Sequence, residues 1–595
     1  MKGKHKKTGT NTYSAGVWEL LPAILLFAVL PLISVGKKVA VTLGKYDWFP
    51  NGDYQYDFFL YWKSVALLVL AVWMLLVLAD RALLRGIRPV GWKSFLPLVL
   101  YGGLAVLSAL TAADRSLALH GLWQQHESLW VLLAYLTAAF YCSQIVTSLR
   151  EVKILLVSLS VGALAQGLIG VSQLSGADFF STGLGRTLLT LGMDPALKED
   201  LVFRFAANAE SPVYLASYTP NYAGVYLVMV LPVVAALLFL LKKRWAKMAA
   251  AGLLVLLAVC LYGTGSKTGI LVCAVLFLAG AVLLSPGGKK KRLILGGCVV
   301  LVLCAVILAD ASGNHRITRA LADSAVKKTD YALQRIAPQK GAVLLQYKGH
   351  TLLLSVGHTE AGDTLLARES GKTLSAYWDT EKQGFRIEGE DFEDILFDAY
   401  VEEENDYLVI NCQDITWNFV KDRGNGEYLY LNRYGKADEI TTAKTVLGGR
   451  EQALTGRGYL WGRTIPLLGK SLLLGSGPDS FILEFPQTDY VMRANTGKWL
   501  MDEVITKPHS LYLQIAVQTG VFSLLCLLVF WGSCIRNLIL SIKKDGRGEL
   551  YALRTCLLLS IAGYLLMGLL NDSNPAVSPI FWALLGLGLA ASRIR

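Results

Sequence analysis

The stretch that organises this chain lies between Leu468 and Gly520. It begins with LGKSLLLGSGPDSFILEFPQ (468–487), passes through an irregular polar segment and ends with KPHSLYLQIAVQTG (507–520). The second piece opens a long apolar run, which predicts a membrane helix over about 509–533. His509, directly after Pro508, would then lie at the first turn of that helix, where water, lipid headgroups and a helix terminus meet. Such a position suits chemistry on a substrate that is partly dissolved in lipid.

The composition around this stretch is that of a membrane protein. Of the 595 residues, 54% are hydrophobic and only 17% are charged, and the mean hydropathy is +0.45. These values exclude an ordinary water-soluble globule. The formal charge of +12 could indicate nucleic-acid binding, but lysine and arginine gather in short clusters between apolar runs, as in cytoplasmic loops. We therefore interpret the positive charge as a topology signal and expect no nucleic-acid partner.

Apolar runs long enough to cross about 30 Å of hydrocarbon predict about twelve membrane helices. The first, GVWELLPAILLFAVLPLISVG (16–36), follows the basic head MKGKHKK. A signal peptide is the alternative, but no convincing small-residue cleavage site follows the apolar part. The remaining spans are expected at about 58–80, 94–112, 128–147, 154–173, 212–241, 248–266, 269–285, 293–309, 509–533, 551–570 and 578–593. The membrane domain would thus have two parts, 1–309 with about nine helices and 509–595 with about three.

Basic clusters occur in every second loop, which predicts that both termini are cytoplasmic. The loops at 174–211 and 310–508 would then be extracytoplasmic. Within the second loop, residues 338–434 contain short β-rich runs such as AVLLQYKGHTLLLSV and DYLVINC, separated by Gly, Asp and Asn turn signals. The fold class expected is therefore an α-helical polytopic membrane protein with an inserted small all-β domain, a sandwich, outside the membrane.

Four motifs on the expected outer face match a known family. YTPNYAGVYLVMVLPVV, from Tyr218, resembles the Asn-Pro-Asn helix start of the O-antigen ligase and polymerase superfamily, with Thr219 in place of the first Asn. LYGTGSKTGILV is similar to its Thr-Gly-Ser-Arg-Gly turn, with Lys267 where Arg is usual. GRGYLWGRTIPLLGKSLLLGSGPDSFILEFPQ (456–487) and KPHSLYLQ resemble its Arg-x-x-x-Trp, Gly-x-Gly-Pro and His-Asn-x-x-Leu-Gln series, with Ser510 in place of Asn. The resemblance covers about 200–310 and 450–530, and its catalytic-loop motifs fall at 450–508.

The resemblance implies an integral membrane glycosyltransferase. Its donor would be a polyprenyl-diphosphate-linked glycan, its acceptor a hydroxyl of a glycan, lipid or protein, and its site the outer face of the cytoplasmic membrane. No cofactor is expected. Ligase and polymerase differ only in the acceptor, and the motifs do not distinguish them.

The departing diphosphate needs positive charge beside it, from cationic side chains or from a metal. The sequence near the motifs has no Asp-x-Asp or His-rich metal cluster, so we expect metal-independent chemistry in which side chains replace the ion. Arginine suits this task because its planar fork binds phosphate through two bonds and stays ionised. The cationic candidates on the expected outer face are Arg186, Arg204, Lys267, Arg450, Arg457 and Arg463. The family match favours Arg204 and Arg457, whereas an ammonium at Lys267 cannot reproduce the two-bond contact.

His509 is the expected general base, because a neutral imidazole can accept the acceptor's proton near the working pH. Position alone would favour a solvated histidine at the membrane interface, and the motif match decides for the base. His120 and His126, on the same face, are lesser candidates for lining the donor site. Asn221, after Pro220, could donate to a phosphate or a sugar, and an ordinary helix cap explains it equally well.

Two other functions remain open. About twelve helices is also a familiar count for a transporter or a flippase of lipid-linked glycans, but such proteins usually carry ionisable groups near the membrane midplane. In this sequence Glu19, Lys63 and Arg554 fall near the expected ends of spans. A receptor anchored by its helices would leave the first long loop and His509 unexplained.

Overall fold

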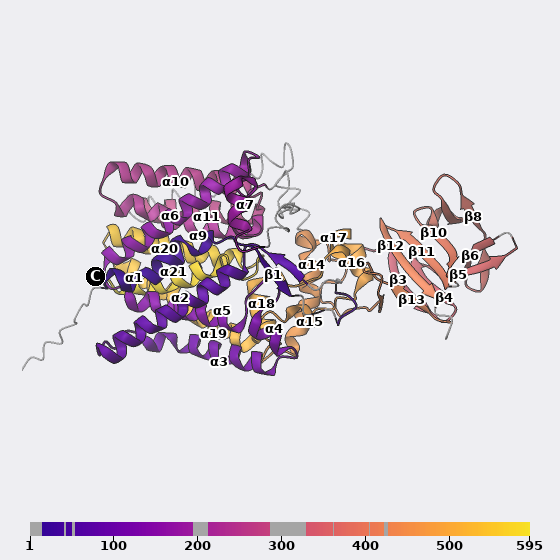
Figure 1. Ribbon diagram of the computed structural model, residues 1–595, viewed down its shortest axis with the longest axis horizontal. Helices are drawn as coiled ribbons and strands as arrows, with labels where there is room; N and C mark the ends of the chain where they lie inside the picture. Colours follow the sequence, from indigo (N-terminus) through magenta and orange to yellow (C-terminus); the bar gives the residue numbers. More distant parts are fainter. Residues whose placement is uncertain are drawn as a thin grey trace, which may run out of the picture.

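The computed structural model describes residues 15–40, 43, 45–49, 54–193, 212–285, 329–360, 362–403, 405–421, 426–544 and 546–594. It consists of a helical bundle, a middle layer of short helices, and a β region at the far end from the bundle (Figure 1). The expected span at 293–309 and the candidate Arg204 lie outside the described residues.

Within the described residues, eight helical stretches are long and apolar enough to cross a membrane. They are α2 (Tyr61–Ala79) with η2 (Asp80–Leu84), η3 (Trp92–Phe95) with α3 (Leu96–Thr111), α6 (Leu149–Leu174), α9 (Pro220–Leu240), α10 (Arg244–Gly263), α11 (Lys267–Leu284), α19 (Val521–Lys544) and α20 (Glu549–Met567). The shorter α1 (Val17–Ala28), η1 (Leu30–Leu32), α5 (Leu129–Ile145) and α21 (Ser578–Arg593) share the same hydrophobic core. The prediction of a multi-pass helical membrane protein is confirmed, and the exact number of spans stays a prediction.

Helix α9 lies inside the bundle. In its most apolar window 83% of the residues are buried, against 22% for the similarly apolar α11. A helix that is apolar all round and surrounded by protein is a core helix, whereas α11 buries few of its side chains and lies at the edge of the bundle. Helix α9 begins at Pro220, and the side chain of the N-cap residue Thr219 accepts a hydrogen bond from the amide of Tyr222. The family-like helix start is therefore fixed at one end of the bundle core.

The single helix expected over 509–533 is wrong, because the chain forms two helices there. Helix α18 (Leu511–Gln518) is short, and α19 starts only at Val521, after Gly520 with a φ of 107°. A Cβ on Gly520 would lie 2.5 Å from the carbonyl oxygen of Leu473, so this close approach requires glycine. His509 consequently precedes α18 and lies outside the membrane helix.

The β region contains two antiparallel sheets in the described part of the chain. One has the order β3-β4-β5-β6-β7 and the other β14-β13-β12-β11-β10-β9-β8. The strands are β3 (Leu333–Gln339), β4 (Ala342–Tyr347), β5 (His350–Thr359), β6 (Gly362–Glu369), β7 (Lys372–Leu374), β8 (Ala376–Asp379), β9 (Gly384–Ile387), β10 (Leu396–Glu402), β11 (Asn405–Cys412), β12 (Ile415–Lys421), β13 (Tyr428–Leu431) and β14 (Ala437–Asp438). Alternating side chains of both sheets meet in one core that includes Leu354, Phe397 and Trp417, as in a sandwich.

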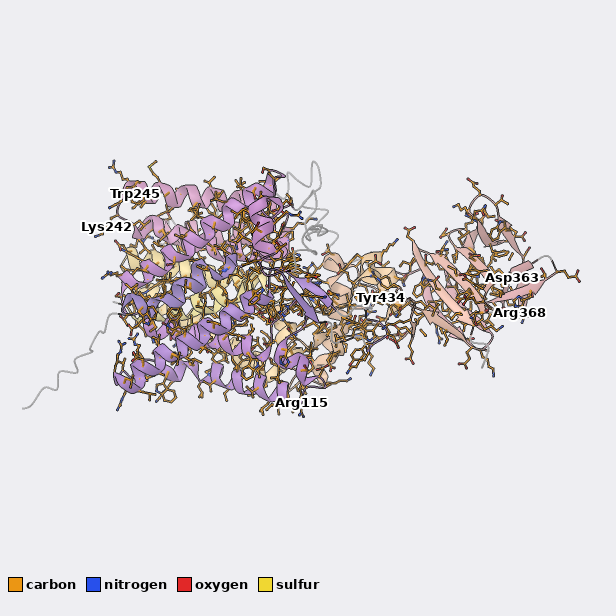
Figure 2. All side chains as sticks on the ribbon, in the orientation of Figure 1. Arg115, Lys242, Trp245, Asp363, Arg368 and Tyr434 are labelled. Carbon is orange, nitrogen blue, oxygen red and sulfur yellow. The ribbon has the colours of Figure 1, made fainter. Side chains whose placement is uncertain are left out.

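The middle layer joins the sandwich to the bundle. It consists of α14 (Ala453–Thr464), η6 (Ile465–Gly469), α15 (Phe481–Glu484), α16 (Tyr490–Thr496) and α17 (Lys498–Asp502). Helix α16 places Tyr490 in the sandwich core, and Asn495 donates a hydrogen bond to the carbonyl oxygen of Leu333 at 2.7 Å. Figure 2 shows Lys242 and Trp245 at the end of the bundle opposite to the β region. The basic turn after α9 and the family motifs of the middle layer are thus at opposite ends of the bundle.

Candidate active site

His509 forms a hydrogen bond with Asp572, which lies in the segment between α20 and α21. The Nδ1 atom of His509 is 2.8 Å from Oδ2 of Asp572, and the backbone amide of Ser510 donates to Oδ1 at 3.0 Å. Because an ionised carboxylate only accepts hydrogen bonds, Nδ1 carries the proton and Nε2 is left as the acceptor in the neutral ring. The side chain of His509 is 48% exposed, whereas that of Asp572 is 1% exposed. In this pair the carboxylate is buried and the imidazole is half exposed.

The backbone around His509 is tied to the same segment. The amide of Leu511 donates to the carbonyl oxygens of both Gly568 and Asn571 at 2.8 Å, and the indole of Trp461 donates to the carbonyl oxygen of Pro508 at 3.0 Å. His509 has a φ of 51°, a left-handed conformation that a residue other than glycine rarely adopts. Such conformations persist where surrounding contacts fix them, and they are frequent at functional sites.

Arg457 reaches the same segment from α14. Its Nε and one terminal nitrogen donate to the carbonyl oxygen of Leu570 at 3.1 and 3.0 Å, and its other terminal nitrogen contacts Leu454 O and Thr455 Oγ1. Leu454, Thr455 and Gly456 form a left-handed run directly before it. Burial lowers the pKa of Arg457, and the nearby Asp572 acts against this shift. Arg457 thus brings a positive charge beside the His509–Asp572 pair, but most of its hydrogen-bond donors already bind the protein.

The ends of α9 and α11 lie against each other. A Cβ on Gly224 would lie 3.0 Å from the side chain of Ser266, the N-cap residue of α11. Asn221 and Lys267 are both exposed at these helix starts. Electrostatic interaction of Tyr222 with Asp572 connects the α9 end to the His509 site. The structure therefore places two of the expected binding residues on neighbouring helix ends.

The other expected cations have different surroundings. Arg186 lies in α7 (Gly183–Leu189), whose last residue, Leu189, accepts a hydrogen bond from the amide of Gly36. Arg463 is buried, and its guanidinium is bound by Glu451 at 3.1 Å and by Asp489 at 2.8 Å. Arg463 was a candidate for binding the diphosphate, but these carboxylates occupy it and it belongs to the core of the middle layer.

The two lesser histidine candidates also differ. His120 is exposed and its Nδ1 lies 3.0 Å from the carbonyl oxygen of Ser116, in its own helix. His126 is 5% exposed, and its Nε2 has no hydrogen-bond partner within the described residues. Burial lowers the pKa of His126, which favours the neutral ring, and Asp57 acts against this shift. His126 therefore lies beneath the surface of the site.

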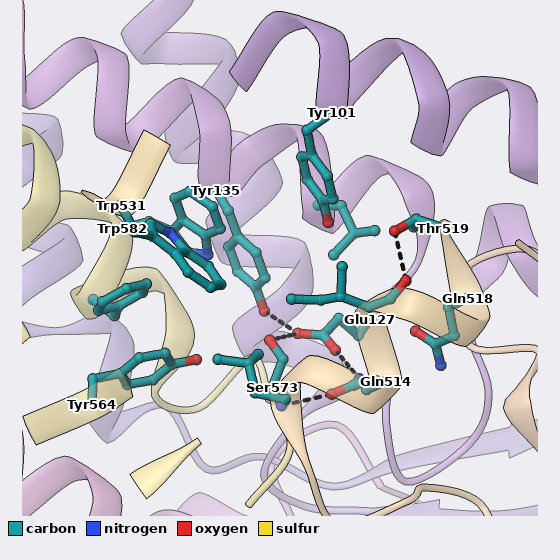
Figure 3. A pocket seen from close by; sticks show the side chains of 14 residues that line it. Tyr101, Glu127, Tyr135, Gln514, Gln518, Thr519, Trp531, Tyr564, Ser573 and Trp582 are labelled. Atoms are coloured by element: carbon teal, nitrogen blue, oxygen red, sulfur yellow. Dashed lines mark hydrogen bonds between the residues drawn. The ribbon is translucent and has the colours of Figure 1, made fainter. Parts of the chain in front are cut away.

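Two buried carboxylates lie near His126. Glu127 accepts hydrogen bonds from the Tyr135 hydroxyl at 3.0 Å and from Nε2 of Gln514 at 2.8 Å (Figure 3). Oδ2 of Asp479 accepts from the amides of Leu122 and Glu127 at 2.9 and 2.8 Å. Burial raises the pKa of Asp479 to about 6, while Lys507 lowers it and Glu127 raises it. Within the described residues, no group of three His, Cys, Asp or Glu side chains is arranged to hold a metal ion.

Asp572, Glu127 and Lys507 were missed by the sequence analysis. The sequence does contain a signal for Asp572, because the polar run NDSN (571–574) interrupts the apolar runs directly before the last expected span. Lys507 was part of the quoted KPHS motif, but no role was expected for it. Glu127 had no signal of its own, since three of its partners, Gln514, Ser573 and Lys507, come from distant parts of the chain.

Comparison with protein families supports the motif analysis. Residues 415–528 match the family model described as O-antigen ligase. The matched range starts at β12 and ends in α19, so it includes Arg457 and His509 and excludes Asp572. No curated protein matches the chain. The match and the motifs agree, and over the matched residues the chain is similar to the O-antigen ligase family.

Proposed function

We propose that the protein transfers a glycan from a polyprenyl diphosphate to an acceptor hydroxyl at the extracytoplasmic face of the cell membrane. The observation that carries this proposal is the pairing of the half-exposed His509 with the buried Asp572, in a chain that is similar to the O-antigen ligase family. Both termini would be cytoplasmic, with the basic turn at Lys242 on the cytoplasmic side.

The proposed reaction forms one bond and breaks one. The acceptor oxygen attacks the anomeric carbon, the bond from that carbon to the diphosphate oxygen breaks, and its electron pair leaves with the polyprenyl diphosphate. The proton of the acceptor hydroxyl goes to Nε2 of His509, which is the acceptor nitrogen of the neutral ring on a side chain that is 48% exposed. Asp572 holds the ring in this tautomer and stabilises the imidazolium that forms, as the carboxylate does in a catalytic triad.

Charge on the leaving diphosphate would be met by cationic side chains, without a metal ion. Arg457 is beside the pair, Lys267 and Asn221 are exposed on the neighbouring helix ends, and Arg186 and Arg204 come from the loop at 174–211. Positive charge fixed in place before the reaction lowers the barrier, because it requires no reorganisation when the diphosphate forms. The bilayer would hold the polyprenyl chain beside this layer.

The direct test is the release of polyprenyl diphosphate by the purified protein in lipid nanodiscs, given a polyprenyl-diphosphate-linked oligosaccharide and a candidate acceptor. A glycosyltransferase releases it in proportion to acceptor glycosylated, whereas a flippase moves the intact donor and releases none. Product analysis separates the two family activities, because a polymerase lengthens a lipid-linked chain and a ligase moves the chain whole to a different acceptor. Transport of intact donor without release would contradict the proposal.

A further inference from the structure

Ser573, the residue after Asp572, has each of its polar groups bound by the protein. Its amide donates to Oε1 of Gln514 at 2.7 Å, and its carbonyl oxygen accepts from Nζ of Lys507 at 2.6 Å. Its hydroxyl donates to Glu127 and lies 2.9 Å from the hydroxyl of Ser578. A residue held in this way cannot rotate or shift without breaking several buried hydrogen bonds, each of which is costly to leave unmade. The position of Asp572 is therefore set largely by its neighbour.

Glu127 is the centre of this arrangement. Its side chain is 1% exposed and its carboxylate accepts from Tyr135, Gln514 and Ser573 (Figure 3). The Gln514 amide nitrogen can only donate, and the two hydroxyls are placed to donate to the same carboxylate. Its counter-charge is Lys507, whose Nζ lies 4.0 Å from Oε2 of Glu127 and whose side chain is 5% exposed.

A cavity of about 20 Å³ adjoins the carboxylate, lined by Glu127, Ser573 and the aromatic rings of Tyr101, Trp531 and Trp582. It has room for water but for no larger group. The arrangement is therefore enclosed by protein and does not form a substrate pocket.

Lys507 links the two segments that carry the pair. Its ammonium donates a hydrogen bond to the carbonyl oxygen of Ser573, the residue after Asp572. In the sequence only Pro508, whose ring fixes the backbone φ, separates Lys507 from His509. Among the described residues, the charged or titratable groups around Asp572 include His509, Arg457 and Tyr222. Those around Ser573 and its partners are Glu127, Lys507, Tyr135, Tyr564 and Asp479, and Asp479 interacts with both Glu127 and Lys507. No hydrogen bond joins Glu127 to His509 among the described residues, and the hydrogen bonds that lead from Glu127 toward the histidine run through Ser573 and Gln514.

We propose that Glu127 and Lys507 are positioning residues, a buried ion pair that holds Asp572 in hydrogen-bond contact with His509. This inference rests on the proposed function for its catalytic meaning, but the geometry it describes exists without substrate. Neutralising Glu127 would leave the Lys507 ammonium buried without its carboxylate. It would also weaken the hydrogen bond between the Ser573 hydroxyl and residue 127. Because Asp572 binds His509 through one hydrogen bond of 2.8 Å, a displacement of about 1 Å would break that contact.

The test measures His509 directly and needs no turnover. Diethyl pyrocarbonate modifies the neutral imidazole, so the modification rate of His509 against pH, followed by peptide mass spectrometry, has a midpoint that falls when the anionic partner is lost. We expect Asp572→Asn and Glu127→Gln to lower this midpoint in the same direction, and the double variant to lower it no further than Asp572→Asn alone. Glu451→Gln, which removes a carboxylate from the separate buried ion pair with Arg463, is the matched control and should leave the midpoint unchanged.

Turnover provides the second readout. If the proposed function holds, Glu127→Gln should lower kcat by about 10- to 100-fold with little change in KM, as outer partners of functional side chains do. A midpoint that stays at the wild-type value in Glu127→Gln, or effects of the two substitutions that add, would overturn the positioning role. A shifted midpoint in a protein that releases no polyprenyl diphosphate would instead contradict only the proposed function.

Discussion

Two charge clusters near the middle layer contain the same kinds of groups and differ in exposure. Arg463 is 2% exposed and lies between Glu451 and Asp489, each 1% exposed. In the second cluster Asp572 is equally buried, but its partner His509 is 48% exposed. In the first cluster every charged side chain is buried and paired, whereas in the second cluster the histidine side chain is half exposed. The comparison indicates that a buried carboxylate stabilises the fold when its partner is also buried, and that it can take part in catalysis when its partner is exposed.

The sharpest way to test this comparison is to remove the open partner. We expect His509→Ala to lower turnover by about 10²- to 10⁴-fold, the usual contribution of a general base, and to lower the melting temperature less than a change in the first cluster does, because the ring is half exposed and Asp572 keeps its hydrogen bond from the Ser510 amide. His358→Ala, in the β region, is the control and should keep wild-type turnover. Release of polyprenyl diphosphate and thermal unfolding would both be measured. Wild-type turnover in His509→Ala would show that the open pair is not the site.

In the buried cluster of Arg463, Glu451 and Asp489, a substitution should lower stability and leave turnover nearly unchanged. We expect Glu451→Gln to lower the free energy of unfolding by about 3–5 kcal/mol, because it leaves part of the Arg463 charge buried without a partner. Turnover per folded molecule should change little. Denaturant unfolding in detergent gives the first quantity and activity of the folded fraction gives the second. A variant as stable as the wild type would show that this pair is not a structural element.

Asp479 extends the comparison to a buried carboxylate that has no partner for Oδ1 among the described residues. Its pKa is raised to about 6, so the folded protein binds this proton more tightly than the unfolded chain does. The contribution of Asp479 to the free energy of unfolding is therefore greatest below about pH 4. It falls by about 3 kcal/mol as the pH rises from about 4 to about 6.

The expected result is a difference in stability between the wild type and Asp479→Asn that changes over this pH range. In the variant, the amide oxygen can still accept from Leu122 and Glu127, and its uncharged group does not titrate. Melting temperatures at pH 4, 5, 6 and 7 measure the difference. Parallel pH curves for the two proteins would show that Asp479 does not titrate in this range.

The smallest effect is expected from removing metal ions. If side-chain cations such as Arg457 balance the diphosphate, incubation with EDTA should leave turnover within about twofold of the untreated enzyme. Activity lost on chelation and restored by a divalent cation would mean that the charge around the open pair comes from a metal.

Several features could be predicted from local sequence. The apolar runs at 61–79, 149–174 and 549–567 form helices close to the expected bounds, because hydropathy over about twenty residues is a local property. The strands of the β region begin at Leu333 and end at Asp438, against an expected 338–434. The break between α18 and α19 at Gly520 could not be predicted in this way. It depends on the carbonyl oxygen of Leu473, which would lie 2.5 Å from a Cβ at this position, and an apolar run carries no information on that contact.

Composition, periodicity and motif spacing are local properties of the chain, so they were enough to predict a multi-pass helical membrane protein, the β character of residues 338–434 and His509 as a candidate. Other features depend on the tertiary structure. The pairing of Asp572 with His509, 63 residues away, could not be predicted from local sequence, nor could the burial of Arg463 or the position of Arg457 beside the pair. The physical reason is that burial and pairing of charges depend on which distant segments pack together. A carboxylate or a guanidinium has the same sequence letter whether packing leaves it open or closes it in.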